Sequence, residues 1–376
     1  MGLTPIQANQ PKLAGNGFFF LADSATFSYA ATCLADGLNQ LGIPVYSNIN
    51  YHDPLITDFA FTASDPPEDM GYLSGVVVNI METAALHNQI VRFAPPHPRT
   101  VVHCMHDNVC DICFPELATF CTHESAQRLV EGTRIPIGFG LSSAMLQHSK
   151  RLMAEPPQRN RRFMANFRPS EGQSVRAALD LGLLPKLREH YEVDTGLVGN
   201  GRWSAEYYQH LSRQFGCLAY GGCFSQDLLR NDWFHYIEPL SKFLRHTRYL
   251  QDTVILRWDS WRFWESLAFG CVTVHLDLER YGFRLPVMPE NWKHYIGLDM
   301  ANLQQDLERM HDERERLSEI AVAGRQWAIE HYSPRAVAKR FINDFKQIYY
   351  PQDAARPADM GYSDFLVENK PSASGI

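Results

Sequence analysis

The segment 254–276, VILRWDSWRFWESLAFGCVTVHL, limits what this chain can fold into more than any other part of the sequence. A short apolar run, Val254–Leu256, leads into a polar loop at 257–260, and a predicted helix then continues to Gly270. A second apolar run, rich in β-branched residues, follows at 271–276. The order strand, loop, helix and strand is typical of an open α/β sheet, in which ligands bind at the carboxyl ends of the strands.

The loop and the helix of this segment carry residues suited to a nucleotide. The first turn of a helix presents unpaired backbone N–H groups, and Arg257 and Arg262 place positive charge beside them, which suits a phosphate. Glu265 lies one turn into the helix, where a carboxylate can accept hydrogen bonds from ribose hydroxyls. Structural alternatives stay open here: Asp259 as the helix N-cap, Arg262 with Glu265 as a surface pair, and the tryptophans at 258, 261 and 264 as a core stripe.

The length and composition predict an ordinary globular protein of two domains. A chain of 376 residues, 45% hydrophobic and 20% charged, exceeds the usual size of a single core. A net charge of −7 argues against non-specific nucleic-acid binding, so we expect no nucleic-acid partner. No stretch approaches the ~20 apolar residues of a membrane span, and the N-terminus lacks the apolar core of a secretory signal. We therefore expect a cytoplasmic protein with no transmembrane segment, leave peripheral membrane contact open, and interpret the eight cysteines as reduced, mostly buried thiols.

The first part of the chain alternates strand and helix patterns. Strands are predicted at 18–21, 44–46, 76–80, 100–103 and 135–139, and a helix at 25–41 is ended by Gly42. Strands separated by helix-length segments indicate parallel βαβ units. Residues 1–150 are thus predicted to form an N-terminal Rossmann-like domain. The polar, basic stretch at 147–162 contains Pro156 and Pro157, and we place a linker at 151–162.

The alternation restarts after the linker. A strand at 163–166, helices at 173–187 and 204–215, and a strand at 217–220 precede the 254–276 unit, and helices occupy most of 302–332. Residues 163–332 are therefore predicted to form a second Rossmann-like domain. Ser333 and Pro334 open a last helix at 333–350, and the tail at 351–376 is expected to be poorly ordered. The predicted fold class is α/β, with two parallel sheets facing across a cleft.

Three segments resemble the nucleotide-sugar-dependent glycosyltransferases of GT-B architecture, in particular their exostosin-like and group 1 branches. The first is WESLAFGCVTV at 264–274, which is similar to their signature helix and strand. GRQWAIEHYSPRAVAKRF at 324–341 is similar to their C-terminal end, and YYQHLSRQFGCLAYGG at 207–222 to a helix–strand step. The resemblance covers most of 160–345, whereas 15–145 match only in general βαβ rhythm.

The resemblance implies that the domain at 1–150 binds the acceptor and that the helix at 333–350 crosses back onto it. It also implies roles for residues of the second domain. Glu265 would accept the ribose hydroxyls of the donor, Arg257, Ser260 and Arg262 would hold its diphosphate, and Gly221 and Gly222 would let the backbone approach the nucleotide. Many retaining members have a second glutamate eight positions before the ribose-binding one, where this chain has Arg257. That departure places a cation beside the diphosphate and suits a metal-independent enzyme.

Other residues could contribute to the chemistry. Arg168, in NFRPSEG at 166–172, lies in a strand-end loop that could hold a phosphate or could be a simple turn. Candidates for a base that accepts the proton of the acceptor hydroxyl are Asp107 and His106 first, then Asp23, then Glu82, although each could be a cap or a solvated group. Cys110 and Cys113, with His103 or His106, could ligate zinc, but packing cysteines and no bound metal are favoured.

Together these features predict an enzyme of carbohydrate biosynthesis. It would be a hexosyltransferase-like glycosyltransferase that moves a sugar from a UDP- or GDP-sugar to a hydroxyl of a glycan, lipid or small molecule, without any further cofactor. The alternatives are a sugar-nucleotide epimerase or hydrolase on the same fold, and a non-catalytic sugar-nucleotide-binding module.

Overall fold

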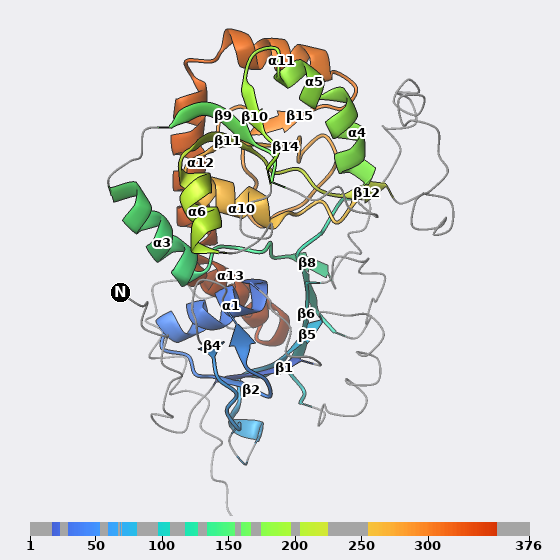
Figure 1. Ribbon diagram of the computed structural model, residues 1–376. Helices are drawn as coiled ribbons and strands as arrows, with labels where there is room; N and C mark the ends of the chain where they lie inside the picture. The colour runs from blue at the N-terminus through green and yellow to red at the C-terminus, as the bar shows by residue number, and fades with distance from the viewer. Residues whose placement is uncertain are drawn as a thin grey trace, which may run out of the picture.

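The computed structural model describes twelve parts of the chain: 17–22, 29–52, 59–66, 68, 70–80, 97–105, 117–126, 134–154, 159–166, 174–196, 204–224 and 255–351. Two α/β units make up the molecule, one above the other in Figure 1. The first contains β1–β8, and the second contains α3 to α12. Within the described residues, no helix is long and apolar enough to span a membrane.

The first unit is built on a parallel six-stranded sheet of order β2-β1-β5-β6-β7-β8. Its strands are short and mostly buried, as expected where both faces of a parallel sheet are covered. A separate antiparallel pair, β3–β4, lies beside it. The bounds of its elements are β1 Phe18–Ala22, α1 Tyr29–Gln40, β2 Val45–Ser47, β3 Tyr51–His52, β4 Phe59–Phe61, a 3-10 turn Met70–Tyr72, β5 Gly75–Ile80, β6 Thr100–Cys104, β7 Thr119–Cys121 and β8 Arg134–Pro136.

The second unit is built on a parallel five-stranded sheet of order β10-β9-β11-β14-β15. Two parallel sheets in one chain confirm the predicted α/β fold class. The elements are α3 Ser143–Ala154, β9 Asn160–Met164, α4 Ser174–Gly182, α5 Leu184–Leu187, β10 Glu192–Asp194, α6 Ala205–Ser212, β11 Gln214–Leu218, β12 Cys223–Phe224, β13 Ile255–Leu256, α10 Trp261–Ala268, β14 Val272–Leu276, β15 Ile296–Leu298, α11 Leu303–Asp312, α12 Leu317–Tyr332 and α13 Pro334–Tyr349.

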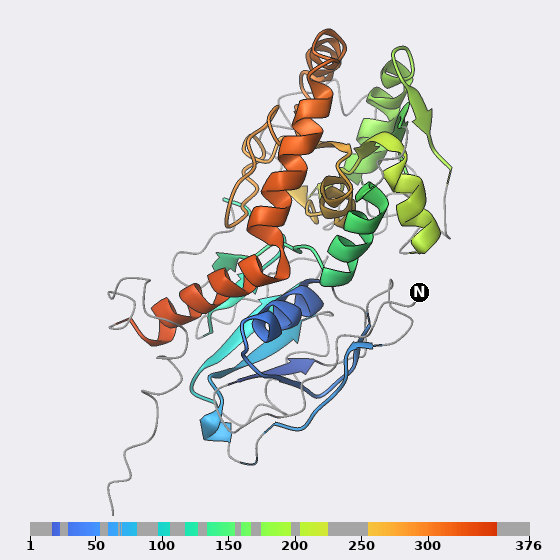
Figure 2. The same cartoon turned by 90° about the vertical axis from the view of Figure 1, so that its left-hand side faces the viewer.

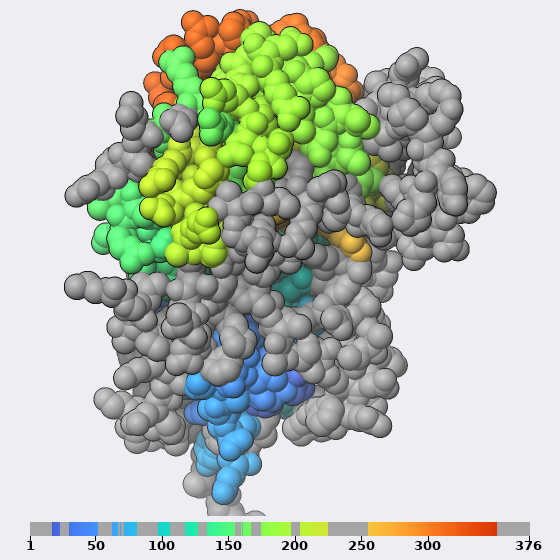
Figure 3. Space-filling model, viewed as in Figure 1, coloured from blue at the N-terminus to red at the C-terminus, as the bar shows by residue number. Residues whose placement is uncertain are grey.

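Several predicted elements differ in detail from those observed. The strand predicted at the start of the 254–276 unit is not part of the parallel sheet, because β13 pairs antiparallel with β12 in a separate two-stranded ribbon. The polar stretch at 147–162 holds most of α3, which packs against α6 and α10, and the start of β9. In Figure 3, α3 and α6 lie side by side on the surface of the second unit. The helix predicted at 173–187 is divided into α4 and α5, and the strand predicted at 217–220 runs from 214 to 218 instead.

The last two helices connect the units. Ser333 is extended, with φ −62° and ψ 157°, so the chain turns between α12 and α13, and Pro334 stands in the first turn of α13. Figure 2 shows α12 running along the second unit and α13 turning onto the first. There α13 packs on α1, and the approach is so close that a Cβ on Gly37 would lie 1.9 Å from the carbonyl oxygen of Pro334.

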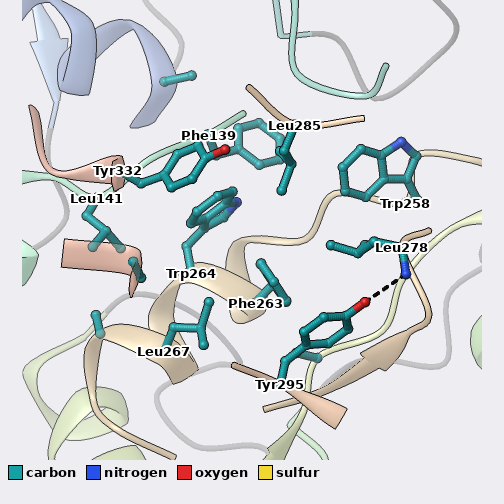
Figure 4. Packing of buried hydrophobic residues seen from close by; sticks show 14 of the residues in the cluster. Phe139, Leu141, Trp258, Phe263, Trp264, Leu267, Leu278, Leu285, Tyr295 and Tyr332 are labelled. Atoms are coloured by element: carbon teal, nitrogen blue, oxygen red, sulfur yellow. Dashed lines mark hydrogen bonds between the residues drawn. The ribbon is translucent and has the colours of Figure 1, made fainter. Parts of the chain in front are cut away.

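The carboxyl ends of the strands of the first sheet face the second unit. Residues that follow β7 contact the loop after β14: Ser125 forms an isolated antiparallel bridge with Phe283, and Arg284 N–H donates to the carbonyl of Glu124. Residues that follow β8 pack on α10 and α12, where Leu141 N–H donates to the carbonyl of Tyr332. Figure 4 shows this shared core, with Trp264 of α10 lying against Tyr332.

Candidate functional site

Three segments of the second unit meet at the carboxyl end of β11. They are the loop 219–222 that follows β11, the loop 257–260 that follows β13, and the start of α4. A Cβ on Gly221 would lie 3.5 Å from a terminal nitrogen of Arg176, 3.5 Å from the carbonyl oxygen of Arg257 and 3.6 Å from Cβ of Ser260. Four residues from distant parts of the sequence therefore lie together: Arg176, Gly221, Arg257 and Ser260. All of them except Arg176 were predicted to belong to the site.

The backbone at this point adopts conformations that are costly for most residues. Gly222 has a φ of +115°, and a Cβ there would lie 2.8 Å from a side-chain carbon of Ile255, so this position requires glycine. Arg257 has a φ of +53°, in the left-handed region that a long side chain rarely occupies. Such strain, of order 1–3 kcal/mol, is concentrated in proteins at ligand-binding and catalytic sites.

Arginine side chains are anchored around this point by backbone carbonyls. Arg176 Nε donates to the carbonyl of Tyr220 at 3.2 Å, and Arg262 Nε donates to the carbonyl of Asn166 at 2.6 Å. These carbonyls lie just beyond β11 and β9, so both guanidinium groups are held at the carboxyl edge of the sheet. Within the described residues, Nε of Arg257 is buried without a hydrogen-bond partner. Sequence reasoning missed Arg176, because it lies in a helix whose pattern indicates only packing.

The N-terminus of α10 opens onto the same point. Its N-cap is Ser260 and not Asp259, so the alternative assignment of Asp259 as the cap is wrong. Ser260 has extended backbone but makes no capping bond, and its Oγ is buried without a hydrogen-bond partner among the described residues. An N-cap hydroxyl normally accepts a bond from the first helical turn. We define the candidate diphosphate site as Arg176, Gly221, Gly222, Arg257, Ser260 and Arg262.

Glu265 lies deeper in the second unit than the surface-pair alternative assumed. Its side chain is buried, and its two carboxylate oxygens accept hydrogen bonds from Tyr207 at 2.8 Å and from Tyr208 at 2.9 Å. Burial and the neighbouring Glu265 carboxylate raise the pKa of Tyr207 well above its usual value, so the phenol keeps the proton that it donates. These bonds connect α10 to α6. Apart from the two adjacent tyrosines, no sequence pattern predicts this pairing.

The tryptophans of the segment play two different roles. Trp258 and Trp264 are fully buried core residues, as the stripe alternative predicted. Trp258 stacks on Phe283 with ring centroids 4.6 Å apart. Trp261, in the first turn of α10, is only half-buried and stacks on Phe139 of the first unit at 4.2 Å and an interplanar angle of 20°.

Asp259 connects the loop to the first unit. Its Oδ1 accepts a hydrogen bond from Trp264 Nε1 at 2.8 Å, and its Oδ2 accepts one from Phe139 N–H at 3.3 Å. Its own N–H donates to Nδ1 of His123 at 3.2 Å. Burial raises the pKa of Asp259 to about 7, although His123 and the hydrogen bonds from Trp264 and Phe139 act to lower it.

A second buried polar network lies near the carboxyl ends of two strands of the first sheet. His103 Nδ1 and Asn79 Oδ1 are 3.0 Å apart, and Asn79 Nδ2 donates to the Tyr51 hydroxyl at 3.1 Å. Because the Asn79 oxygen can only accept, Nδ1 of His103 carries the proton. Burial lowers the pKa of His103 to about 3, so this imidazole stays neutral.

Other predicted site residues lie outside the described parts of the chain. They are Asp107, His106, Asp23, Glu82 and Arg168, together with Cys110 and Cys113 of the zinc alternative. The strands that precede the first four are described: β1 leads to Asp23, β5 to Glu82 and β6 to the pair at 106–107. Where the chain is described, no three His, Cys, Asp or Glu side chains gather as metal ligands.

The comparisons with known proteins give structural neighbours only. No family model matches the sequence, and no curated protein matches it. In structure, the chain is similar to Anabaena HepE in complex with UDP and glucose (TM-score 0.45, 11% identity, covering 88% of this chain and 100% of that one). It is also similar to a T4 phage BGT mutant in complex with UDP-glucose (0.43, 10%, 89% and 99%) and to a glycosyltransferase from Rickettsia africae (0.42, 9%, 89% and 99%). Similarity at this level does not transfer a substrate or a reaction to this chain.

Proposed function

We propose that this protein is a glycosyltransferase that moves a sugar from a nucleoside diphosphate donor to a hydroxyl acceptor, without a metal. The observation that carries the proposal is the candidate diphosphate site. It combines three arginines, a Gly–Gly loop and a helix N-terminus whose Ser260 hydroxyl has no partner within the described residues. Gly221 and Gly222 lie in one of the segments in which the sequence resembles this class of enzyme, and the helix that Ser260 caps continues into another.

The chemistry of the site favours a diphosphate over a single carboxylate. Guanidinium groups bind phosphate oxygens through short, charge-assisted hydrogen bonds, and a helix N-terminus adds roughly half a positive charge. Arg176 and Arg262 hold two guanidinium groups at one edge of the sheet, and the backbone carbonyl of Arg257 lies beside Gly221 there. The departing nucleoside diphosphate gains negative charge during sugar transfer, and fixed cations there stabilise it without a metal ion.

In this proposal the acceptor binds on the first unit. The carboxyl ends of its strands face the second unit, and the candidate bases Asp107, His106 and Asp23 follow β6 and β1. One of them would take the proton of the acceptor hydroxyl as the sugar transfers. The binding assay below distinguishes UDP from GDP, and the turnover assay identifies the sugar.

Glu265 is proposed to meet the ribose hydroxyls. Its carboxylate oxygens accept hydrogen bonds from Tyr207 and Tyr208, and an ionised carboxylate offers about four lone-pair sites to donors such as hydroxyls. Pyrophosphate has no ribose, so comparing its binding with that of UDP or GDP distinguishes contact with the ribose from structural support of the site. Glu265→Gln should weaken UDP or GDP binding while leaving pyrophosphate binding unchanged. Equal weakening of both ligands would instead assign Glu265 to the support of α10.

Calorimetric titration with UDP, GDP and inorganic pyrophosphate tests the proposal directly. Losing one charge-assisted bond costs about 1.5–3 kcal/mol, so Arg257→Ala or Arg176→Ala should weaken binding by about tenfold or more. Arg162→Ala is the matched control, because Arg162 is an exposed arginine on β9 paired with Glu192. It removes the same charge and should leave affinity unchanged.

Turnover is tested with UDP-sugars and GDP-sugars by following release of the nucleoside diphosphate with and without added hydroxyl acceptors. Acceptor-dependent release together with a glycosylated product is the expected result. If the wild-type protein binds no nucleoside diphosphate, or if Arg162→Ala weakens binding as much as Arg257→Ala, the proposed site is wrong. Binding with no transfer to any acceptor would overturn the enzymatic assignment and leave a binding module.

A further inference from the structure

The loop that supplies Arg257 and Ser260 to the candidate diphosphate site is held by both units. From the second unit, His275 Nε2 contacts the carbonyl of Trp258 at 3.0 Å. From the first unit, the Glu124 carbonyl accepts a hydrogen bond from Trp258 Nε1 at 3.1 Å. Trp258, the residue after Arg257, is thus held by partners in both units.

A second set of connections passes through Asp259. Its backbone N–H donates to His123, which follows β7, and its carboxylate accepts from Phe139 N–H, which follows β8. The other carboxylate oxygen accepts from Nε1 of Trp264 in α10, the helix that follows Asp259. A buried carboxylate is costly unless it is hydrogen-bonded, so this one fixes three elements relative to each other.

The loop of the first unit is shaped for this contact. Phe139 lies between Gly138 and Gly140, whose φ angles are +75° and +74°. The two glycines turn the backbone so that the Phe139 N–H meets Asp259 while its ring stacks on Trp261, the residue after Ser260. The first unit therefore touches the residues on both sides of the Ser260 N-cap.

We propose that His123 and Asp259 are positioning residues through which the first unit sets the shape of the candidate diphosphate site, so that donor affinity depends on the contact between the units. This inference rests on the proposed function, since it concerns the same site. Neither residue belongs to the set that would contact the diphosphate. Their effect passes through the strained Arg257 backbone and the position of Ser260.

The titratable groups around Asp259 give this contact a pH dependence. His123 faces it from the first unit, and Tyr332 of α12 lies close enough to be influenced by its charge. Because the carboxyl takes up a proton as the pH falls through about 7, it becomes a weaker acceptor for Phe139 and Trp264 on the acid side. Donor affinity of the wild type should fall there more steeply than that of Asp259→Asn, which does not titrate.

The experiment compares four variants by calorimetric titration with UDP, GDP and pyrophosphate. His123→Ala removes the acceptor for Asp259 N–H and should weaken nucleotide binding at least fivefold. His123→Asn keeps an acceptor oxygen near the position of Nδ1 and should restore affinity to within about twofold of wild type. Asp259→Asn supplies the pH comparison. Ser149→Ala is the matched control, because the buried Ser149 hydroxyl donates to the Ala268 carbonyl at the opposite end of α10.

The outcomes separate this inference from the proposed function. His123→Ala and Ser149→Ala should lower the melting temperature by similar amounts, but only His123→Ala should change affinity. If Arg257→Ala weakens binding and His123→Ala does not, the positioning role is wrong while the diphosphate site stands. If Ser149→Ala weakens binding as much as His123→Ala, the effect is general loss of stability and the inference fails. Absence of nucleotide binding in the wild type overturns both proposals.

Discussion

Replacing Asp259 by asparagine should change how the stability of this protein depends on pH. Burial raises the pKa of Asp259 from 3.8 to about 7. A pKa difference of about 3 units between the unfolded and folded states corresponds to about 4 kcal/mol, at about 1.4 kcal/mol per unit. The folded state binds the proton more tightly than the unfolded chain, so this group makes the protein less stable as the pH rises from about 4 to about 7. Above the folded pKa its contribution no longer changes.

The measurement is urea unfolding of wild type and Asp259→Asn at several pH values between about 5 and 8. Subtracting the two curves cancels every other titrating group. The asparagine leaves one amide N–H₂ facing a donor, from Phe139 or Trp264, which costs about 1–3 kcal/mol at every pH. On top of that constant offset, the variant should gain about 3 kcal/mol relative to wild type between pH 5 and pH 8, since this range covers about two pKa units of the titration at about 1.4 kcal/mol each. Parallel curves, with a difference that does not change with pH, would refute the assignment of a raised pKa to Asp259.

Other predictions concern packing and thiol chemistry. Gly37→Ala should lower the free energy of unfolding by about 3 kcal/mol or more, because its Cβ would meet the Pro334 carbonyl of α13 at 1.9 Å. Gly42→Ala is the control in the same urea-unfolding measurement and should cost only about 1 kcal/mol, because Gly42 has a φ of +77° but no atom lies within 4 Å of the position that its Cβ would take. Equal losses for the two variants would contradict the close approach of α1 and α13. Cys271 should resist thiol reagents at pH 8 in the native protein and react in urea, since burial raises its pKa to about 11; mass mapping that finds it modified without urea would place it outside the core.

Much of the fold followed from local patterns in the sequence. Apolar runs at β1, β5 and β6 predicted buried parallel strands, and Ser333 with Pro334 predicted the start of the last helix. These signals work because each depends on neighbours within a few residues: a side-chain period, a cap, or a proline with a fixed φ.

Features that depend on distant partners were not predictable in this way. β13 has the apolar residues of a strand in the parallel sheet, yet it pairs with β12 in an antiparallel ribbon. No sequence pattern between the two strands predicts this pairing. Arg176 appears as an ordinary helical residue until the Tyr220 carbonyl and Gly221 lie beside it. Asp259 has the residue type and position expected of an N-cap, but its carboxylate accepts hydrogen bonds from Phe139 and Trp264 at the interface and does not cap α10.

The residues from 257 to 265 combine several features that reduce stability when taken alone. They include a left-handed arginine, an N-cap hydroxyl without a capping bond, and two buried carboxylates, Asp259 and Glu265. Apolar residues of similar size could fill these positions with equal or greater stability, since buried charges seldom stabilise a fold on balance. Local rules are broken together at one place mainly where a site needs them to be. The concentration of such costs at the carboxyl edge of the second sheet, beside three arginines, is therefore an argument for a binding function that does not depend on resemblance to any other protein.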